Sequence, residues 1–358
     1  MMDEVKFVVE ASEAESLAKK LGLPSVHHLL PVLVQPAQSL ARPPISNYPV
    51  AAVGLGSDGR LFLGVNLEFP GVPLHHSVHA EQFLLTNLAV HRCPRLLAFA
   101  VSAAPCGHCR QFLQETRNSS DIKIHITSTQ NNPDMFQPLR DILPNPFGPF
   151  DLLDDETPLL LERHNNGLSL SEDLCNGFSV NSGNLSNGSN KNEISVNSGN
   201  LTNGSNKNEI SVNSGNLSNG YEISVNSGNL SNGSDKSGST LLRIAALEAA
   251  NDSHAPYSGC PSGVALMDCE GKIYRGSYVE SAAYNPSLGP VQAALVAFVA
   301  RGGGGYERIV AAALVEKEGA KVRQEDTARL FLKLVSPKCD LKVFHCCFAE
   351  NGCKKIDD

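Results

Sequence analysis

One histidine and two cysteines, spaced as in a metal site, are the residues of this chain best suited to chemistry. His79 lies two residues before Glu81, and Cys106 and Cys109 follow in a Pro-Cys-x-x-Cys sequence. These three residues can supply three zinc ligands, and zinc prefers four in a tetrahedron, so one position remains for water. Zinc lowers the pKa of such a water and makes it a nucleophile near neutral pH. We therefore expect one Zn²⁺ on His79, Cys106 and Cys109, with Glu81 moving protons beside it.

Two predicted helices would bring these side chains together. The apolar pattern predicts a helix over 80–90 and a second over 106–116, which begins beside Pro105, a residue suited to a helix start. The two cysteines are three residues apart and share one face of a helical turn. A helix N-terminus carries partial positive charge, which favours thiolates over thiols. Two helix N-termini can thus converge on one metal.

Two alternatives for metal binding remain open at this stage. In the first, His108 turns back between the two cysteines and completes a closed, structural zinc site. In the second, a cluster near the end of the chain holds another metal: His345, Cys346, Cys347 and Cys353. The ordinary alternative for that cluster is burial, because free cysteine behaves as a small apolar residue.

Predicted strands alternate with helices around the metal-binding motif. Residues 56–59, Gly-Ser-Asp-Gly, predict a hairpin turn between two apolar runs. The alternation predicts an α/β layer sandwich with at least some parallel pairing. Helices over 13–21 and 26–34 predict a helical N-terminal segment within residues 1–45. The predicted strands are 50–55, 60–66, 96–102 and 122–126.

A repetitive stretch divides the chain. The heptapeptide Ser-Val-Asn-Ser-Gly-Asn-Leu begins at Ser179, Ser195, Ser211 and Ser224. Asparagine, serine and glycine dominate there, and too few large apolar residues are present to form a core. We therefore expect residues 166–240 to be a disordered low-complexity linker.

The sequence after the linker repeats the sequence before it. Gly276-x-x-x-Glu280 corresponds to Gly64-x-x-x-Glu68 at an offset of 212 residues, and Ser258 corresponds to Ser46 at the same offset. The repeat predicts a second domain with the strand and helix skeleton of the first.

The chemistry of the first domain is not repeated. Allowing one extra residue, Val291-Gln292-Ala293-Ala294 aligns with residues 78–81, so that Gln292 replaces the histidine and Ala294 replaces the glutamate. No Pro-Cys-x-x-Cys sequence follows. The second domain is therefore predicted to be degenerate and non-catalytic.

Charge and hydropathy exclude several classes of function. The 358 residues carry a net charge of −8, which argues against nucleic acid as a partner, because phosphate binding needs a basic surface. No apolar run approaches the roughly 20 residues of a membrane-spanning helix. The N-terminal residues lack the apolar core of a signal peptide, and the ten cysteines form no disulfide framework. We expect a cytosolic protein with reduced thiols and no membrane partner.

These motifs resemble those of the tandem-domain, homodimeric type of cytidine deaminase. Their sequences are most similar to those of the plant enzymes. His-x-Glu followed by Pro-Cys-x-x-Cys is also the signature of zinc nucleobase deaminases. The resemblance covers residues 5–165 and 240–348. It rests on four segments: 64–69 (Gly-Val-Asn-Leu-Glu-Phe), 78–82 (Val-His-Ala-Glu-Gln), 105–112 (Pro-Cys-Gly-His-Cys-Arg-Gln-Phe) and 255–264 (Ala-Pro-Tyr-Ser-x-x-Pro-Ser-Gly-Val).

The resemblance implies a fold and a division of the chain. The fold is a three-layer α/β/α sandwich with a mixed sheet, present twice. The implied division is a helical segment at 1–45, a catalytic zinc domain at 46–165, the linker at 166–240, a degenerate domain at 241–350 and a tail at 351–358.

The resemblance also implies hydrolytic deamination of cytidine and deoxycytidine to uridine, deoxyuridine and ammonia, in pyrimidine salvage, by a homodimer. Asn66 and Glu68 would bind the ribose hydroxyls, and Phe147 would lie over the pyrimidine. Tyr48 stands where the family has a stacking phenylalanine, and Ala80 belongs to the same substrate site.

Alternatives to these roles are simpler. Asn66 and Glu68 could mark an ordinary exposed strand end, and Phe147 could pack in the core. The whole chain could be a catalytically impaired paralogue that folds, binds zinc and acts only as a dimer partner.

Overall fold

The structure is a computed structural model that describes residues 5–129, 132, 135–170 and 238–348, and the backbone alone of 192–195, 211–214 and 234–237. Most of the expected linker lies outside the described residues. The expectation that it is disordered concerns those residues and stays a prediction. Within it, β8 (Asn192–Ser195) and β9 (Ser211–Ser214) pair antiparallel and form a sheet of their own.

The first domain is built on a sheet with the strand order β1-β3-β2-β4-β5-β6. Strands β4 and β5 are parallel and every other neighbouring pair is antiparallel, so the sheet is mixed, as expected. The strands are β1 (Val8–Val9), β2 (Ala51–Gly56), β3 (Leu61–Val65), β4 (Leu96–Val101), β5 (Lys123–Ile126) and β6 (Gln137–Pro138).

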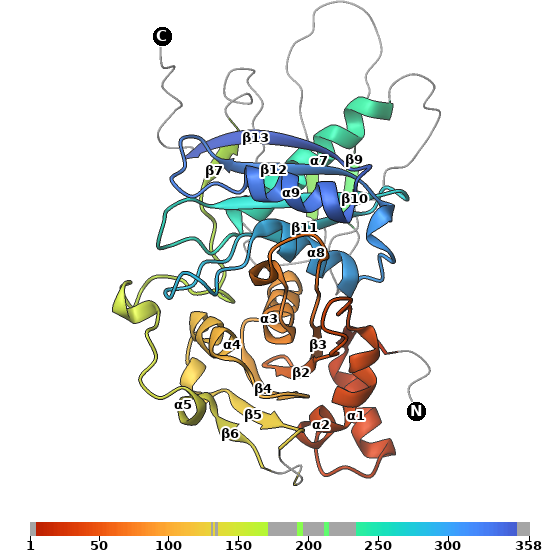
Figure 1. Cartoon of the computed structure of the whole chain (residues 1–358), viewed down its shortest axis with the longest axis vertical. Coiled ribbons are helices and arrows are strands. Elements are labelled where there is room, and N and C mark those ends of the chain that lie inside the picture. Colours follow the sequence, from red (N-terminus) through yellow and green to blue (C-terminus); the bar gives the residue numbers. More distant parts are fainter. Residues whose placement is uncertain are drawn as a thin grey trace, which may run out of the picture.

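Helices cover both faces of this sheet (Figure 1). Helix α2 packs on one face with α1 against it, and α3 packs on the other. The helices are α1 (Ala11–Lys20), α2 (Val26–Ala37), α3 (Ala80–Val90), α4 (Gly107–Phe112) and α5 (Leu139–Ile142). The bounds of α3 are those predicted from the sequence. The predicted helix over 106–116 is instead the short α4, continued by a 3-10 turn, η3 (Leu113–Glu115).

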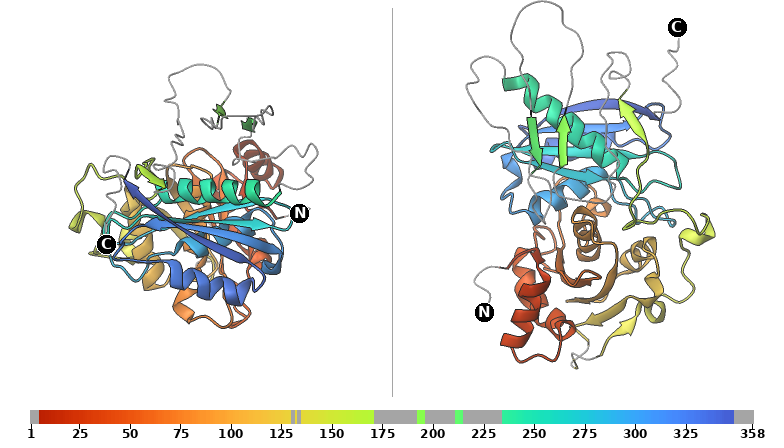
Figure 2. Two further views of the ribbon diagram at one scale, coloured as in Figure 1. Left: turned by 90° about the horizontal axis from the view of Figure 1, so that it is seen from above. Right: turned by 180° about the vertical axis from the view of Figure 1, so that it is seen from behind.

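The second domain repeats this arrangement. Its sheet has the order β11-β10-β12-β13-β7, with β12 and β13 parallel. Helix α7 lies along one face of the sheet and α8 covers the other, so each domain is a three-layer sandwich (Figure 2). The elements are α7 (Ser234–Asn251), β10 (Ser262–Asp268), β11 (Ile273–Ser277), α8 (Pro290–Ala300), β12 (Ile309–Lys317), α9 (Glu325–Val335) and β13 (Asp340–Phe348).

The edge strand β7 (Leu168–Leu170) joins the second sheet although it precedes the linker in sequence. It pairs antiparallel with β13, and Asn166 binds the backbone of Ala250 and Ser253. Because α7 also begins at Ser234, the expected linker bounds of 166–240 are too wide at both ends. The polar composition of these flanks hid the few apolar residues that the second core buries, among them Leu168 and Leu170.

The larger of the two hydrophobic cores is shared by both domains, and the smaller one lies within the second domain. Helices α3 and α8 pack against each other between the two sheets (Figure 1). Glycines allow each helix to approach its own sheet closely. A Cβ on Gly64 would lie 2.1 Å from the carbonyl oxygen of Ala80, and a Cβ on Gly276 would lie 2.4 Å from that of Pro290. The second domain therefore contributes to the packing that stabilises the first.

The equivalence of these glycines corrects the sequence alignment. Glu68 and Glu280 stand at the expected offset of 212 residues, but His79 and Gly289, the residues just before α3 and α8, stand 210 apart. The loop from 281 to 287 is thus two residues shorter than its counterpart from 69 to 77. Gly289 replaces the histidine, so the prediction that Gln292 does so was wrong. The repeated alanines and valines of α8 make several registers look alike.

Two further expectations can be checked here. No helix in the described part of the chain is long and apolar enough to cross a membrane. Cys347 is disulfide-bonded, so the expectation of reduced thiols is wrong at that position. The free cysteines among the described residues are Cys93, Cys106, Cys109, Cys260, Cys269, Cys339 and Cys346.

Candidate active site

The predicted metal ligands lie together in the first domain. The Nδ1 atom of His79 is 3.5 Å from the sulfur of Cys106 and 3.2 Å from that of Cys109, and the two sulfurs are 3.7 Å apart. With ordinary zinc bond lengths, a tetrahedron separates two sulfurs by about 3.8 Å and a nitrogen from a sulfur by about 3.6 Å. The three atoms therefore fit three corners of a zinc tetrahedron. Within the described residues, no other group of three histidine, cysteine or acidic side chains is placed to hold a metal.

Two helix starts position these ligands. His79 immediately precedes α3 and Cys106 immediately precedes α4, while Cys109 lies in the first turn of α4. The amide of His79 donates to Oε1 of Gln82, which fixes the backbone at the start of α3. Cys109 is fully buried, whereas Cys106 is exposed. The metal position is therefore bounded by the hydrophobic core at Cys109 and is open to solvent at Cys106.

His108 does not complete a closed site. Its ring stacks on that of His79 with centroids 5.4 Å apart, and its Nε2 lies 3.1 Å from Nε2 of Gln82. It is not among the side chains grouped around the metal position. The alternative with a fourth protein ligand is therefore not supported, and the fourth position of the tetrahedron remains available to water or substrate.

The electrostatics of the cysteine pair suit a cation. Hydrogen bonds from Cys109 and His79 lower the pKa of Cys106 to about 3, so this sulfur is a thiolate. The same hydrogen bond with Cys106, together with burial, raises the pKa of Cys109. The hydrogen bond to Cys106 also raises the pKa of His79. Because metal ligands must be deprotonated, binding a metal here releases protons.

Glu81 lies directly beside the ligands. Its side chain is 4% exposed, and burial raises the pKa of its carboxyl group, while a hydrogen bond with Cys109 opposes that rise. A carboxyl group that takes up a proton more readily than usual is suited to exchange protons with a bound reactant.

Asn66 and Glu68 hold the loop in front of the site. The side chain of Asn66 donates to the carbonyl oxygen of Tyr48 and accepts from the amide of Val50. Glu68 accepts from the amides of Ile45 and Ser46, both at 2.8 Å, and from the Ser46 hydroxyl at 2.5 Å. Burial would raise the pKa of Glu68, but these hydrogen bonds lower it. Both side chains are half-buried and paired, which does not fit an ordinary exposed strand end.

The two aromatic candidates are open to solvent. Tyr48 is 59% exposed and Phe147 is 47% exposed, so packing of Phe147 in the core is ruled out. Gln111 donates to the carbonyl oxygen of Phe147 and so ties its loop to α4. Ala80 is buried, with its carbonyl oxygen against Gly64.

Sequence reasoning missed three residues that support the site. They are Ser46, which binds Glu68; Gln111, which binds the Phe147 loop; and Arg110, which donates to the carbonyl oxygens of Pro105 and Ile142 and so braces α4. Arg110 and Gln111 belong to the conspicuous motif at 105–112. That motif was the available signal, although it did not reveal their partners.

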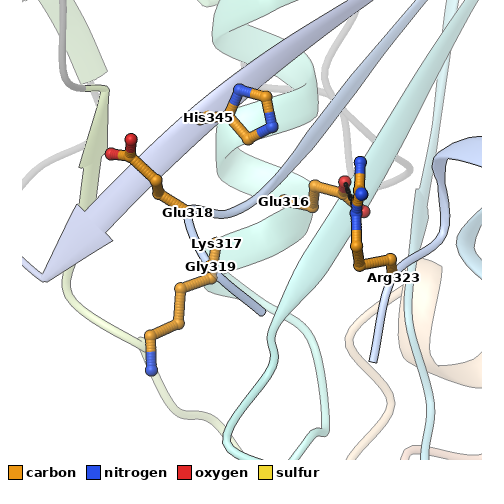
Figure 3. Close-up of a pocket in the computed structure, with 6 residues that line it drawn as sticks. All are labelled: Glu316, Lys317, Glu318, Gly319, Arg323 and His345. Carbon is orange, nitrogen blue, oxygen red and sulfur yellow. Dashed lines mark ion pairs between the residues drawn. The ribbon is translucent and has the colours of Figure 1, made fainter. Parts of the chain in front are cut away.

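The second domain has a pocket beside the loop that follows β12, the counterpart of the loop after β4 that carries the cysteines. Counted on from the paired strands β10 and β12, Gly319 falls at the position of Cys106. A pocket of about 220 Å³ is lined by Gly319 and its neighbours. Figure 3 shows Glu316, Arg323 and His345 around it. Buried Glu316 is already engaged, because it accepts from the amide of Gln324 and lies 3.5 Å from Arg323. The loop after β12 thus carries charged side chains in place of thiols.

The predicted cluster at the end of the chain does not form a site among the described residues. His345 faces the pocket of Figure 3, whereas Cys346 is buried in the second core. Cys353 lies outside the described residues.

Comparisons with known proteins agree with this geometry. Two matches to the cytidine and deoxycytidylate deaminase zinc-binding region cover residues 25–125 and 139–329. Cytidine deaminase 1 of Arabidopsis thaliana is 52% identical over 96% of this chain and 99% of its own length. The chain belongs to the cytidine deaminase family. The members of this family are hydrolases, and the tandem arrangement and the fold predicted from the sequence are confirmed.

Other relatives show the range of the family. Cytidine deaminase 6 of Arabidopsis thaliana is 44% identical over 88% of this chain and 91% of its own length. Probable inactive cytidine deaminase 4 of the same organism is 37% identical over 97% of this chain and 98% of its own. The solved cytidine deaminase from Mycobacterium tuberculosis is 32% identical over 34% of this chain and 95% of its own, with a TM-score of 0.30.

Proposed function

We propose that this chain is an active, zinc-dependent cytidine and deoxycytidine deaminase that holds one Zn²⁺ in its first domain. The observation that carries the proposal is the convergence of His79, Cys106 and Cys109 at tetrahedral distances, with the buried Glu81 beside them. The 52% identity to a protein named cytidine deaminase supports the choice of substrate. A cytosolic role in pyrimidine salvage is part of the same proposal.

Glu81 is the proton carrier of the proposed reaction. Zinc, when bound by the three ligands, supplies a nucleophile from water at neutral pH. Water adds at C4 of the cytosine ring, the bond from C4 to the amino nitrogen breaks, and ammonia leaves. Glu81 passes one proton of the attacking water to ring nitrogen N3 and then passes the second, from the hydroxyl formed at C4, to the leaving amine. Its burial keeps bulk water from taking over this exchange.

The loop pinned by Asn66 and Glu68 forms the nucleoside side of the site. Both residues meet the loop from 45 to 50 through hydrogen bonds. In the proposal they position this loop and also present polar groups to the ribose. Tyr48 and Phe147 offer exposed aromatic surface to the pyrimidine, and Ala80 forms part of the floor at the start of α3.

A homodimer would complete this site. The exposure of Tyr48 and Phe147 leaves two large aromatic side chains of the first domain facing solvent. Phe150 and Leu152, shortly after Phe147 in sequence, are each 50% exposed as well. A second chain covering these side chains would bury the aromatics and shield the substrate from bulk water.

Substrate profiling tests the proposal. Purified protein is incubated with cytidine, deoxycytidine, deoxycytidylate or single-stranded RNA, and the ammonia released is measured. The proposal expects ammonia from the two nucleosides and none from RNA, in keeping with the net charge of −8. Full zinc content without turnover would instead favour the impaired paralogue. Salt-dependent RNA deamination would indicate a nucleic-acid enzyme.

A further inference from the structure

Glu115 is a buried carboxylate of the first domain whose side chain is held entirely by the second. It is fully buried, and it lies in η3, six residues after Cys109. Its Oε2 accepts from the hydroxyl of Tyr257 at 2.6 Å and lies 3.2 Å from Nε2 of His254. Its Oε1 accepts from the amide of Ala282 at 2.8 Å. Both carboxylate oxygens are thus satisfied by groups across the domain boundary.

Two of these groups, Tyr257 and His254, belong to a second-domain segment that corresponds to the loop held by Glu68 in the first domain. Tyr257 stands 212 residues after Ile45 and Ser258 stands 212 after Ser46. Glu280 accepts from the amides of Tyr257 and Ser258 and from the Ser258 hydroxyl, as Glu68 does with Ile45 and Ser46. The second domain has kept this loop in place without a metal beside it.

This loop binds Glu115, which lies at the end of the segment that carries Cys106 and Cys109. Helix α4 has only six residues and runs straight into η3, so Glu115 fixes the far end of the segment that begins at Cys106. Hydrogen bonds from Arg110 brace the near end. A buried carboxylate that loses its donors is strongly destabilised, so the segment cannot leave the second domain at low cost.

We propose that Glu115 is a positioning residue that locks the cysteine-bearing segment onto the second domain, so that the second domain determines how firmly the first holds its metal. The contacts of Glu115, Tyr257, His254 and Ala282 carry this inference. It rests on the proposed zinc site. The proposal assigns the degenerate domain a function that requires neither a metal nor a catalytic residue of its own.

Zinc release from the full-length holoprotein tests the proposal. The variants are Tyr257→Phe, which removes one hydroxyl, and Glu115→Gln, which keeps the shape of the side chain. The control is Tyr274→Phe: Tyr274 is a buried tyrosine whose hydroxyl donates to Asp268 at 2.8 Å within the second domain. A chromogenic chelator in excess reports the rate at which zinc leaves the protein.

We expect Tyr257→Phe to release zinc about tenfold faster than the unaltered protein, because changes in groups that support metal ligands cost about 10- to 100-fold in affinity. Glu115→Gln should release it at least as fast. The double variant should be no faster than the faster single variant, since both remove one interaction. Tyr274→Phe should release zinc at the unaltered rate. Unchanged release in Tyr257→Phe, or equal acceleration in Tyr274→Phe, would overturn the proposal.

A second measurement separates this proposal from the zinc site itself. If the unaltered protein binds no zinc, the proposed function fails, and the lock is then tested by amide hydrogen exchange of residues 107–115. Faster exchange of this segment in Tyr257→Phe than in Tyr274→Phe supports the lock. Equal exchange in both variants and in the unaltered protein contradicts it.

Discussion

Gly289 occupies in the second domain the position that His79 occupies in the first. Each residue immediately precedes the helix that packs under its sheet, and the close contacts of Gly64 and Gly276 fix the register of these helices. In the same register Val291 stands at the position of Glu81. The second domain therefore lacks both the ligand and the proton carrier.

Restoring the histidine alone should not create a second metal site. Gly289 has an ordinary backbone conformation with φ of −64°, so Gly289→His needs only a shift of the Gln292 side chain. The loop after β12 offers no thiol, because Gly319 stands where Cys106 would be. We expect zinc analysis of this variant to give one ion per chain. Two ions per chain would show that the second domain retains a usable ligand set.

Glu81→Gln should separate metal binding from turnover. The amide keeps the size of the side chain and cannot carry the proton. We expect full zinc content and a loss of turnover of about 10²- to 10⁴-fold, the usual contribution of a general acid or base. Turnover within a few-fold of the unaltered protein would remove Glu81 from the mechanism.

Cysteine substitutions should distinguish ligands from bystanders. Cys109→Ser removes a fully buried sulfur from the metal position, so we expect loss of zinc and of activity. Cys269→Ser is the control, because Cys269 is a free cysteine of the second domain and is not among the side chains grouped around the metal position. It should leave zinc content unchanged. Equal zinc content in both variants would contradict the assignment of Cys109.

The paired loops of the two domains offer a test of the nucleoside side. Ser46 donates two hydrogen bonds to Glu68, and Ser258 donates the same two to Glu280; in each case the amide of the preceding residue donates a third. Replacing either serine by alanine should lower stability by about 1 kcal/mol. Only Ser46→Ala should raise KM, by about fivefold, because substrate binding must then supply about 1 kcal/mol of free energy to order the loop. An equal KM in both variants would show that the loop at 45–48 does not meet the substrate.

Shortening the linker should leave the protein folded and active. Strand β7 docks near the end of α7, because the amide of Leu168 donates to Asn251, while α7 begins 17 residues earlier at Ser234. The connection must therefore run back along about 26 Å of helix. Deleting residues 181–223 leaves about 20 residues, which can span that length. We expect a soluble protein with normal zinc content, checked by size-exclusion chromatography and metal analysis; aggregation would assign the repeats a structural role.

Local chemistry explains what the sequence could predict. The metal ligands were predictable because zinc requires particular side chains at short, fixed spacings. Helix α3 was predicted with its observed bounds because its apolar pattern is continuous between His79 and His91. The repeat of Glu68 as Glu280 was visible because both lie in short motifs.

Relationships between distant residues could not be predicted in this way. The hydrogen bond between Glu115 and Tyr257 joins residues that are 142 positions apart. The sequence around either residue does not indicate its partner. The register of α8 was misassigned because alanine and valine recur along it, and only its contact with Gly276 decides the alignment. The short strand β7 was missed because three residues carry too little periodicity to stand out in a polar stretch.

Zinc content measured together with the conversion of cytidine is the most direct test of the central claim. Purified full-length protein is analysed for metal, and the fall in ultraviolet absorbance is then followed as cytidine is added. The site formed by His79, Cys106, Cys109 and Glu81 predicts one zinc per chain, with uridine and ammonia formed in equal amounts. Protein with one zinc per chain and no uridine would contradict the claim that this family member is an active deaminase.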